Sequence, residues 1–357
     1  MNKNELLKQK IRQVIDEQGG CLSFAIFMQM ALYEPGLGYY VSGLRKFGEQ
    51  GDFITAPELS SAFSQCVAKQ CQTILAELVA PSILEFGAGS GVMAADILLY
   101  LEQHAALPAY YFILDVSPDL RFVQQETLQA SCPHLLDKVQ WLDRLPEDFV
   151  GVVLANEVLD AMPVHLFRVQ GGQALELGVT RDFALAPLGK VLPLPVSLPE
   201  GYQSECCLAI EPWLKDLYAS MRQGVVLLID YGYKESVYYH PERRMGTLMC
   251  HYQHRAHSDP FLHIGLQDIT AHVNFTAVAR AAEAAGFGVV GYTSQASFLL
   301  ALGIEQVILN EMDVVSRYRM TQAIKRLLLP TEMGELFQVI ALAKSMGALA
   351  LQGFSLC

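Results

Sequence analysis

The chain has 357 residues, of which 52% are hydrophobic and 17% are charged, so it is neither a disulfide-stapled miniprotein nor a disordered chain and can bury a sizeable core. Its formal net charge of −12 argues against a general nucleic-acid binder, which needs Lys and Arg to neutralise phosphates, and favours a cationic or neutral partner. No apolar run approaches the roughly 18 residues that a membrane-spanning helix needs.

The first 80 residues are predicted to form a helical extension and a lid. The start of the chain has neither the apolar core of a signal peptide nor an Arg-rich transit sequence, which predicts a cytoplasmic, bacterial-type protein. Apolar residues at three- and four-residue steps predict a helix over 4–18, and a second helical stretch reaches Leu32. Five glycines and two prolines between Tyr33 and Pro57 predict an irregular surface segment of the kind that closes over ligands.

Residues 81–357 are predicted to form one domain in which strands and helices alternate. This alternation favours an α/β fold with a doubly wound, mostly parallel sheet. The expected strands are 82–86, 110–115, 150–155, 225–230, a strand starting at Val289, and 337–343. The expected helices are 92–101, 118–130, 275–285 and most of 295–329. Two insertions, 164–210 and 233–272, interrupt the pattern, and the first contains a β-hairpin of 165–170 with 173–179.

The cysteines and histidines do not predict a metal site. The eight cysteines include no Cys-x-x-Cys pair, and Cys206 and Cys207 are neighbours that can hardly form an ordinary bridge, so we expect reduced, mostly buried thiols. No cysteine or carboxylate completes a recognised ligand spacing with a cluster of four histidines in the second insertion. These histidines are His251, His254, His257 and His263.

A glycine-rich turn, Glu85-Phe86-Gly87-Ala88-Gly89-Ser90-Gly91, lies between the expected strand 82–86 and the expected helix 92–101. Glycines at this point let the backbone turn sharply and let a ligand lie against main-chain atoms. The third glycine comes one position earlier than in a dinucleotide fingerprint, and no Gly-Lys-Ser/Thr follows as in a phosphate-binding loop. A compact G-x-G-x-G with an acid ahead of it favours S-adenosylmethionine, which carries a cationic amino group and sulfonium but no phosphate.

Two acids are predicted to hold opposite ends of this cofactor. Glu85 suits its cationic part, and Asp115, 24 positions after Gly91, is near the roughly 20-residue offset at which an acid binds ribose hydroxyls. The alternative is a purely structural turn with two solvated carboxylates. The expected cofactor-binding residues are Glu85, Gly87, Ala88, Gly89, Gly91, Asp115, Val116, Ser117 and Asn156, with Asp52, Thr55 and Pro57 from the glycine-rich segment.

Several further blocks follow one another along the chain. They are Gly38-Tyr39-Tyr40, Gly51 to Glu58, Glu85 to Gly91, Asn156 to Pro163, Asp230-Tyr231-Gly232, Gly246-Thr247-Leu248 and Asp268 to Phe275. With these blocks in this order, the chain resembles the MidA-like S-adenosylmethionine-dependent methyltransferases, a family that includes mitochondrial complex I assembly factors. The resemblance extends from about Tyr33 to Ala343.

The resemblance implies a class I methyltransferase fold with a seven-stranded sheet, an N-terminal helical extension and a substrate-side insertion. Mitochondrial members symmetrically dimethylate arginine in a complex I subunit, which implies an arginine-bearing protein substrate here, for example a respiratory-complex subunit. Four positions depart from the usual pattern: Asp115 replaces Glu, Ala56 replaces Ser, Ser64 replaces Gly and Asn274 replaces Asp. The last departure weakens a catalytic role for that position.

An arginine acceptor is protonated at neutral pH, so paired carboxylates would hold its guanidinium and turn one nitrogen toward the methyl group. Glu157 and Asp160 follow the expected strand 150–155 at the edge where such sheets bind ligands, and we predict that they hold the substrate. Asn156 would contact the cofactor or the target nitrogen. In the alternative interpretation Asn156 caps a following helix, and Glu157 stabilises that helix because its negative charge lies near the positive end of the helix dipole.

Three lower-ranked residues complete the predicted catalytic set. Tyr231, at the end of the expected strand 225–230, either lines the acceptor channel or packs in the core. His254 and Asp268, in the second insertion, are substrate-site candidates. The glycine-rich segment either closes over the cofactor or is a surface Ω-loop.

The sequence therefore predicts an S-adenosylmethionine-dependent methyltransferase that modifies a protein, with arginine as the favoured acceptor. Two alternatives stay open: methylation of a small-molecule oxygen or carbon, and a non-catalytic assembly factor that retains the cofactor pocket. A guanidinium needs facing carboxylates and a mouth open to a chain, whereas a small substrate needs a closed apolar pocket. The number of methyls added and the oligomeric state are not predicted.

Overall fold

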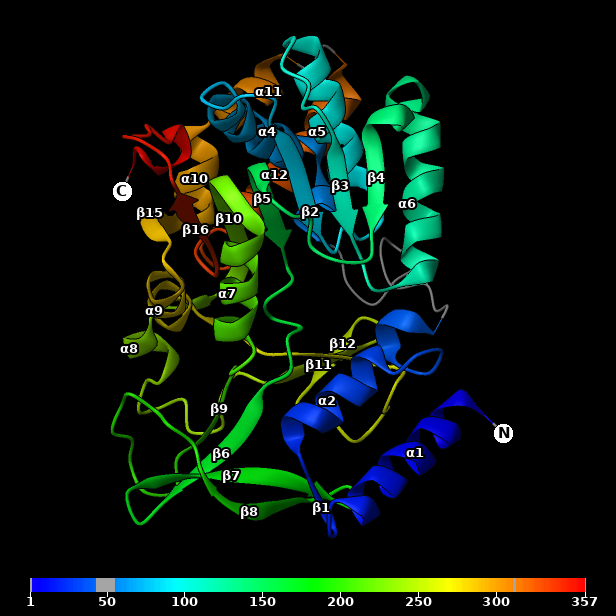
Figure 1. Cartoon of the computed structure of the whole chain (residues 1–357), viewed down its shortest axis with the longest axis vertical. Helices are drawn as coiled ribbons and strands as arrows, with labels where there is room; N and C mark the ends of the chain where they lie inside the picture. The colour runs from blue at the N-terminus through cyan, green and yellow to red at the C-terminus, as the bar shows by residue number, and fades with distance from the viewer. Residues whose placement is uncertain (1, 43–54, 311–312, 357) are drawn as a thin grey trace. The chain divides into compact units, whose positions relative to one another are not determined.

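A computed structural model describes residues 2–42, 55–310 and 313–356 of the chain. The chain divides into two compact units (Figure 1). Unit 1 comprises Met1–Phe53, Leu159–Pro212 and Tyr233–Ala277, and unit 2 comprises Ile54–Val158, Trp213–Gly232 and Val278–Cys357. None of the helices in these described ranges is long and apolar enough to cross a membrane.

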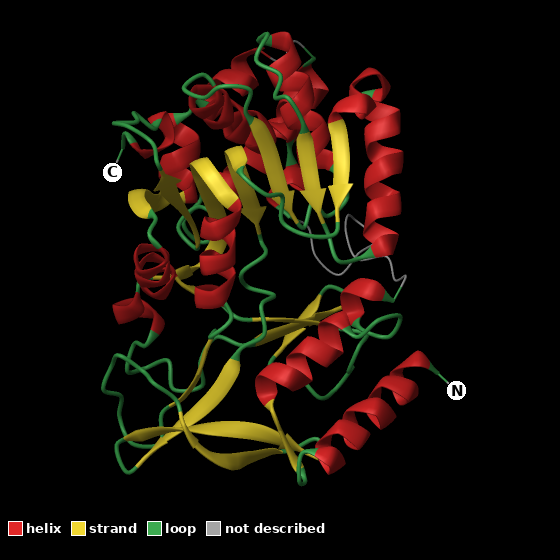
Figure 2. Cartoon of the chain, in the orientation of Figure 1, coloured by secondary structure: helices red, strands yellow, loops and turns green. Residues whose placement is uncertain are grey.

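Unit 2 is built on a sheet in which parallel strands outnumber antiparallel ones (Figure 2). Along the sheet the strands are β15 (Gly288–Ser294), β16 (Phe337–Lys344), β10 (Met221–Tyr233), β5 (Phe149–Asn156), β2 (Ser82–Phe86), β3 (Tyr111–Leu114) and β4 (Val139–Leu142). Strands β10, β5, β2, β3 and β4 are parallel to one another, whereas β16 is antiparallel to both β10 and β15. The expected α/β fold is therefore present, with mixed strand directions.

The register of the parallel strands brings several carboxyl ends to one edge of this sheet. Phe86 of β2 lies opposite Leu114 of β3 and Ala155 of β5. Asn156, the last residue of β5, lies opposite Ile229 of β10. The segments that leave β2, β3, β5 and β10 consequently begin close together, and they contain the glycine turn and several of the predicted site residues.

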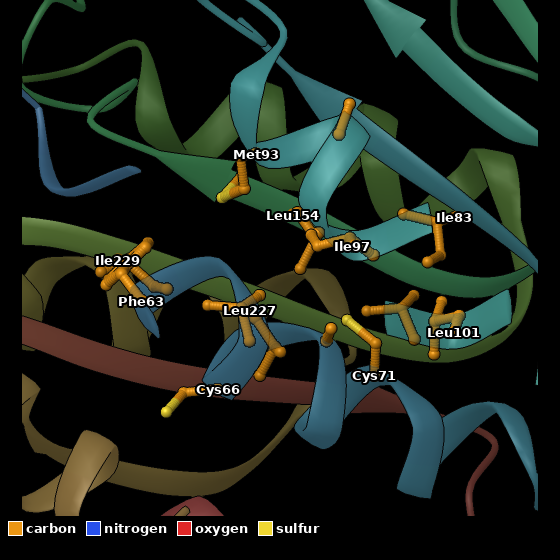
Figure 3. Packing of buried hydrophobic residues seen from close by; sticks show 14 of the residues in the cluster. Phe63, Cys66, Cys71, Ile83, Met93, Ile97, Leu101, Leu154, Leu227 and Ile229 are labelled. Atoms are coloured by element: carbon orange, nitrogen blue, oxygen red, sulfur yellow. The ribbon is translucent and has the colours of Figure 1, made fainter. Parts of the chain in front are cut away.

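The core of unit 2 forms where alternate residues of the apolar strands, which point to one face of the sheet, pack with an apolar stripe of the covering helices (Figure 3). Helix α5 presents Met93, Ile97 and Leu101 at four-residue steps, and all three are buried. They pack with Ile83 of β2 and Leu154 of β5.

The helices of unit 2 are α3 (Ala56–Leu59), α4 (Ser61–Leu75), α5 (Val92–Gln103), α6 (Pro118–Ser131), α10 (Gln295–Ala301), α11 (Ile304–Asn310) and α12 (Val314–Leu328). Unit 2 also has 3-10 turns at Pro133–Lys138 and Gln352–Phe354. Helices α7 (Ile210–Ser220) and α9 (Phe275–Ala285) begin in unit 1 and continue into unit 2.

Unit 1 consists of two antiparallel sheets and short helices. In the larger sheet the order is β1 (Cys21–Ser23), β7 (Gln173–Thr180), β6 (His165–Gln170) and β9 (Gln203–Cys206), and β8 (Leu185–Val191) also pairs with β7. The smaller sheet has the order β12 (Arg255–His257), β11 (Met249–Tyr252) and β13 (Asp268–Thr270). The remaining elements are α1 (Lys3–Glu17), α2 (Phe24–Tyr33), a 3-10 turn at Tyr39–Val41, α8 (Glu235–Tyr238) and β14 (Val273–Asn274).

Of the expected extension of 1–80, Met1–Phe53 groups with both expected insertions in unit 1, and the part from Ile54 onward belongs to unit 2. The reason is pairing at long range: Leu22 of β1 lies opposite Val179 of β7, and Leu166, Leu177 and Leu22 share one apolar core with α1 and α2. The expected hairpin at 165–170 and 173–179 is present as β6 and β7, joined by two glycines with left-handed φ angles. The elements that were not predicted include strands β4 and β8 and helices α4 and α7.

A buried carboxylate, Glu205, ties together the interior of unit 1. Its Oε1 accepts hydrogen bonds from the Tyr238 hydroxyl at 2.9 Å and from the backbone nitrogen and hydroxyl of Thr247 at 2.9 and 2.6 Å. Thr247 Oγ1 in turn accepts from the backbone nitrogen of His272 at 2.9 Å. A Cβ added to Gly246, whose φ is +73°, would lie 2.0 Å from Glu205 Oε2. The Gly246 backbone therefore leaves no room for a side chain.

We expect Gly246→Ala to destabilise the protein by about 2–4 kcal/mol, because it combines backbone strain with displacement of a buried carboxylate. Gly172→Ala is the matched control, since Gly172 has the same φ of +73° with nothing within 4 Å of the added Cβ. Thermal unfolding of both variants measures the difference. Equal losses of stability would show that backbone strain alone accounts for the effect and that the contact with Glu205 contributes nothing.

Candidate functional site

The turn after β2 has the backbone shape that its sequence predicts. Gly87, Gly89 and Gly91 all have left-handed φ angles, of 58°, 53° and 85°, which side chains rarely adopt. Gly91 is the N-cap of α5, and its backbone nitrogen donates to the Ala88 carbonyl at 2.8 Å. A Cβ on Gly91 would lie 3.0 Å from the Cα of Gln124. The turn is therefore held tightly against helix α6.

Glu85 lies at the base of this turn as a buried acid, with 2% of its surface exposed. Tyr111 of β3 donates its hydroxyl hydrogen to Glu85 Oε2 at 2.7 Å. Burial raises the pKa of Glu85 to about 7, the hydrogen bond from Tyr111 opposes this shift, and the nearby Asp115 adds to it. Glu85 is therefore divided between its neutral and charged forms near neutral pH.

Asp115 follows β3 and is held by donors on both carboxylate oxygens. Oδ1 accepts from the backbone nitrogen of Ser117 at 2.9 Å, and Oδ2 accepts from the side-chain amide of Gln124 at 2.8 Å. Ser117 is buried and caps α6 by accepting from the backbone nitrogen of Leu120 at 3.3 Å. Between them, Val116 is 64% exposed and leaves an apolar surface beside the acid.

The segment after β5 contains the predicted pair Asn156 and Glu157. Asn156 Nδ2 donates to Glu157 Oε1 at 3.1 Å, and the buried Asn156 Oδ1 has no hydrogen-bond partner among the described residues. Glu157 has a φ of +53°, an uncommon conformation for a residue with a side chain. No helix begins here, so the interpretation of Asn156 as a helix cap is wrong. The chain instead bends sharply and presents Glu157 from a strained position.

Helix α3 joins this segment to the glycine turn. The backbone nitrogen of Ala56 donates to Glu157 Oε1 at 3.4 Å, and Ser90 donates a short hydrogen bond to Glu58 Oε1. The predicted residues Thr55 and Pro57 belong to the same helix start, Thr55 as its N-cap and Pro57 buried within its first turn. Asp52 lies outside the described residues. Residues 55–58, at the end of the predicted lid, therefore contact both the turn and Glu157.

Asp230, three residues before the end of β10, is a candidate site residue that the sequence analysis missed. It is fully buried, and its oxygens accept from the backbone nitrogens of Val158 at 3.2 Å and Tyr231 at 2.9 Å. Asp230 thus holds the segment that carries Glu157. Tyr231, the residue predicted instead, has its ring 5.4 Å from that of Phe337 in an edge-to-face contact and packs against the core of unit 2.

Three other predicted residues belong to unit 1. Asp160 and Asp268 are buried, with 5% and 2% of their surfaces exposed. The Tyr40 hydroxyl donates to the Asp268 carboxylate at 3.0 Å, and both acids raise the pKa of Tyr40, whose burial raises it most. His254 is at the exposed tip of the β11–β12 hairpin, where Gln253 and His254 both have left-handed φ angles. This conformation is the one that a two-residue hairpin turn requires.

Two of the other histidines of the second insertion, His257 and His263, take part in aromatic contacts. The His263 ring stacks on Tyr252 with centroids 4.1 Å apart, and the His257 ring is 6.1 Å from that of His263. In the described ranges, no three His, Cys, Asp or Glu side chains form a group that could hold a metal ion. The seven described cysteines are all free thiols.

Comparisons with known proteins extend over most of the chain. Residues 66–293 match a family model described as "Putative S-adenosyl-L-methionine-dependent methyltransferase". A Drosophila melanogaster protein named protein arginine methyltransferase NDUFAF7 homolog, mitochondrial, is 30% identical, with 90% of this chain and 82% of the relative covered. The Danio rerio protein arginine methyltransferase NDUFAF7 is 28% identical over 89% of this chain and 82% of its own length.

A solved structure from Burkholderia thailandensis, bound to S-adenosyl-homocysteine, is similar to nearly the whole chain. Its sequence is 41% identical, its TM-score is 0.92, and the match covers 99% of this chain and 95% of that one. A second crystal structure from the same organism is 40% identical with a TM-score of 0.90.

Proposed function

Because the chain belongs to the family of S-adenosyl-L-methionine-dependent methyltransferases, we propose that it transfers a methyl group from this cofactor to an arginine side chain of a protein. The cofactor is the one predicted from the glycine turn, and the family is the one predicted from the ordered sequence blocks. Arginine as acceptor is supported by the names of the relatives at 25–30% identity and by the acids near the turn. The class I arrangement, with seven strands and helices on both faces, and the role of each residue below are parts of the proposal.

The residues at the edge of the unit 2 sheet fit the cofactor chemically. Glu85 would hold its cationic amino-acid end, and the unpartnered Asn156 Oδ1 offers a second acceptor there. Asp115, fixed by two donors, would accept hydrogen bonds from the ribose hydroxyls. The exposed Val116 would cover the adenine face. When bound, the cofactor supplies an electrophilic methyl group on a sulfonium.

Glu157 is the residue we propose to hold the acceptor. A protonated guanidinium donates to a carboxylate through two parallel N–H groups, which fixes its plane and localises its charge. The transferred methyl forms a bond to nitrogen as its bond to sulfur breaks, and the nitrogen loses one proton. The left-handed conformation at Glu157 costs about 1–3 kcal/mol, and such strain is concentrated at functional sites. This strained acid beside the glycine turn is the observation that carries the proposal.

Four residues have subordinate roles in the proposal. Asp160, Asp268 and His254 stay predicted substrate contacts, and Tyr231 would lie beside the acceptor. The net charge of −12 favours a cationic partner and is consistent with an arginine-bearing protein. A respiratory-complex subunit as substrate and a cytoplasmic location stay predictions; the animal relatives are named as mitochondrial proteins.

The acceptor can be tested directly. The purified protein is incubated with lysate protein and methyl-labelled cofactor, and the labelled residues are identified by mass spectrometry. Methylarginine in a small number of proteins is the expected result. Label confined to low-mass metabolites would replace arginine with a small-molecule acceptor. Cofactor binding without any transfer would favour a non-catalytic assembly factor.

The affinity for S-adenosyl-homocysteine is expected to increase with pH between about 5.5 and 7.5, because the cofactor's amino group selects the charged form of Glu85, whose pKa is about 7. The stability of the ligand-free protein should respond in the opposite sense. A raised pKa means that Glu85 binds a proton more tightly in the folded state than in the unfolded state. The stabilisation of the fold that this provides is fully present below the ordinary pKa of a glutamate and is lost as pH rises through about 7.

Calorimetry across this range measures the affinity, and Glu85→Gln is the control. The Gln side chain keeps an acceptor for Tyr111 but cannot titrate, so its affinity should be lower at pH 7.5 and nearly independent of pH. A wild-type affinity that does not change over the same interval would remove Glu85 from the amino-group site.

A further inference from the structure

Helix α6 contains one buried polar side chain, Gln124, in an otherwise apolar stripe. Leu120, Gln124 and Leu128 follow one another at four-residue steps and are the buried residues of this helix. Gln124 is 0% exposed. Burying an amide is unfavourable unless its hydrogen-bonding groups are paired, whereas a leucine at this position would continue the stripe without that requirement. A glutamine here therefore needs an explanation other than packing.

The hydrogen bonds of Gln124 connect two parts of the proposed cofactor site. Its Nε2 donates to the carbonyl oxygen of Gly89 at 3.1 Å and to Asp115 Oδ2 at 2.8 Å. Its Oε1 accepts from the indole nitrogen of Trp141 at 3.0 Å. An indole N–H can only donate, so this contact fixes which end of the amide faces Trp141 and turns the NH2 group toward the turn and the acid.

We propose that Gln124 is a positioning residue that sets the distance and orientation of Asp115 relative to the glycine turn, and thereby tunes recognition of the cofactor's ribose. The inference rests on the proposed binding of the cofactor at this turn. With one oxygen of Asp115 held by Ser117 and the other by Gln124, the carboxylate is held in a defined orientation at the carboxyl end of β3. The same amide holds the Gly89 carbonyl, so the two halves of the site cannot shift independently.

Two variants of Gln124 and one control variant test this role. Gln124→Leu removes all three hydrogen bonds while retaining most of the volume. Gln124→Glu retains the shape but places a second carboxyl group against Asp115. Gln125→Leu is the control, because Gln125 is the next residue of the same helix and is exposed. Circular dichroism and thermal unfolding establish that each variant is folded before binding is measured.

The probes are S-adenosyl-homocysteine, measured by calorimetry, and adenosine and 2′-deoxyadenosine, measured as competitors. We expect Gln124→Leu to lose about tenfold to a hundredfold in affinity for S-adenosyl-homocysteine, the range for removing buried hydrogen bonds to a charged group. It should also lose most of the preference for adenosine over 2′-deoxyadenosine. A residue that only fills the core would not change this preference. Gln125→Leu should match the wild type in both measurements.

Gln124→Glu gives an independent readout if the leucine variant does not fold. As the pH rises, the new carboxyl group loses the proton that it could donate to Asp115 and becomes a like charge beside it. The ratio of its affinity to that of the wild type should therefore fall with increasing pH. A folded Gln124→Leu that binds like the wild type, or an affinity ratio for Gln124→Glu that is constant with pH, would overturn the inference. Failure of the wild type to bind S-adenosyl-homocysteine would overturn the proposed function as well.

Discussion

Gly91→Val is expected to reduce the affinity for S-adenosyl-homocysteine at least about a hundredfold. Gly91 has a φ of +85°, and a branched side chain is strongly disfavoured in that conformation. The added Cβ would also lie 3.0 Å from the Cα of Gln124, a backbone atom that cannot move without shifting helix α6. Either the glycine turn must change its conformation or helix α6 must move away from it, and either movement separates Asp115 from the glycines.

Gly303→Val separates this effect from general strain. Gly303 is also in unit 2, its φ is +80°, and the nearest atom to its added Cβ is 3.6 Å away, an ordinary contact. We expect both variants to lose stability and only Gly91→Val to lose binding, as measured by calorimetry and thermal unfolding. Gly91→Ala provides a milder substitution for the same comparison. If Gly303→Val were equally impaired in binding, the loss would reflect stability and not the shape of the turn.

The glycine turn could be predicted from sequence because its requirement is local. Left-handed φ angles at Gly87, Gly89 and Gly91 need glycine whatever the rest of the chain does, so the residue types report the backbone shape directly. Asp115 was predicted for a similar reason, since a short strand and its following acid occur at a regular interval after the turn. Both predictions, the glycine turn and Asp115, required only the order of strands and helices along the chain.

The grouping of the N-terminal residues depends on contacts that no local pattern encodes. Strand β1 has three residues and pairs with β7 far along the chain, with Leu22 opposite Val179. Strand β8 is mostly exposed and contains a proline and a glycine, so it lacks the alternation that marks a strand. The bend at Glu157 was also not foreseen, because the polar residues after β5 resemble a helix start. The segment after β5 is instead held by two acceptors in β10, the backbone carbonyl of Ile229 and the carboxylate of Asp230.

Gln124 was missed although the sequence contains a signal for it. A glutamine four residues from a leucine on each side, within the apolar stripe of a predicted helix, is a buried polar group that must find partners. Its partners could not be named from sequence, because the Gly89 carbonyl and the Trp141 indole come from two other elements. Sequence can therefore indicate that such a residue has a special role, and only the fold identifies the role.

Glu157→Gln is expected to slow methyl transfer about 10²–10³-fold while the affinity for S-adenosyl-homocysteine changes less than about threefold. Glutamine keeps an oxygen that can accept from Ala56 and from Asn156, so the segment after β5 should retain its conformation. What it loses is the negative charge that holds a guanidinium by two parallel hydrogen bonds. The rate of label transfer into lysate protein, at saturating cofactor, measures the effect.

Asp143→Asn is the control, because Asp143 also lies in unit 2 but is exposed and pairs only with Arg121 among the described residues. It should transfer methyl groups at the wild-type rate. The two measurements on Glu157→Gln distinguish three roles. A slower rate with unchanged affinity indicates an acid that acts on the acceptor, and a proportional loss of affinity would assign Glu157 to the cofactor site. An unchanged rate would contradict the proposed role, and the strain at this residue would then serve only the path of the chain between β5 and the bend that follows it.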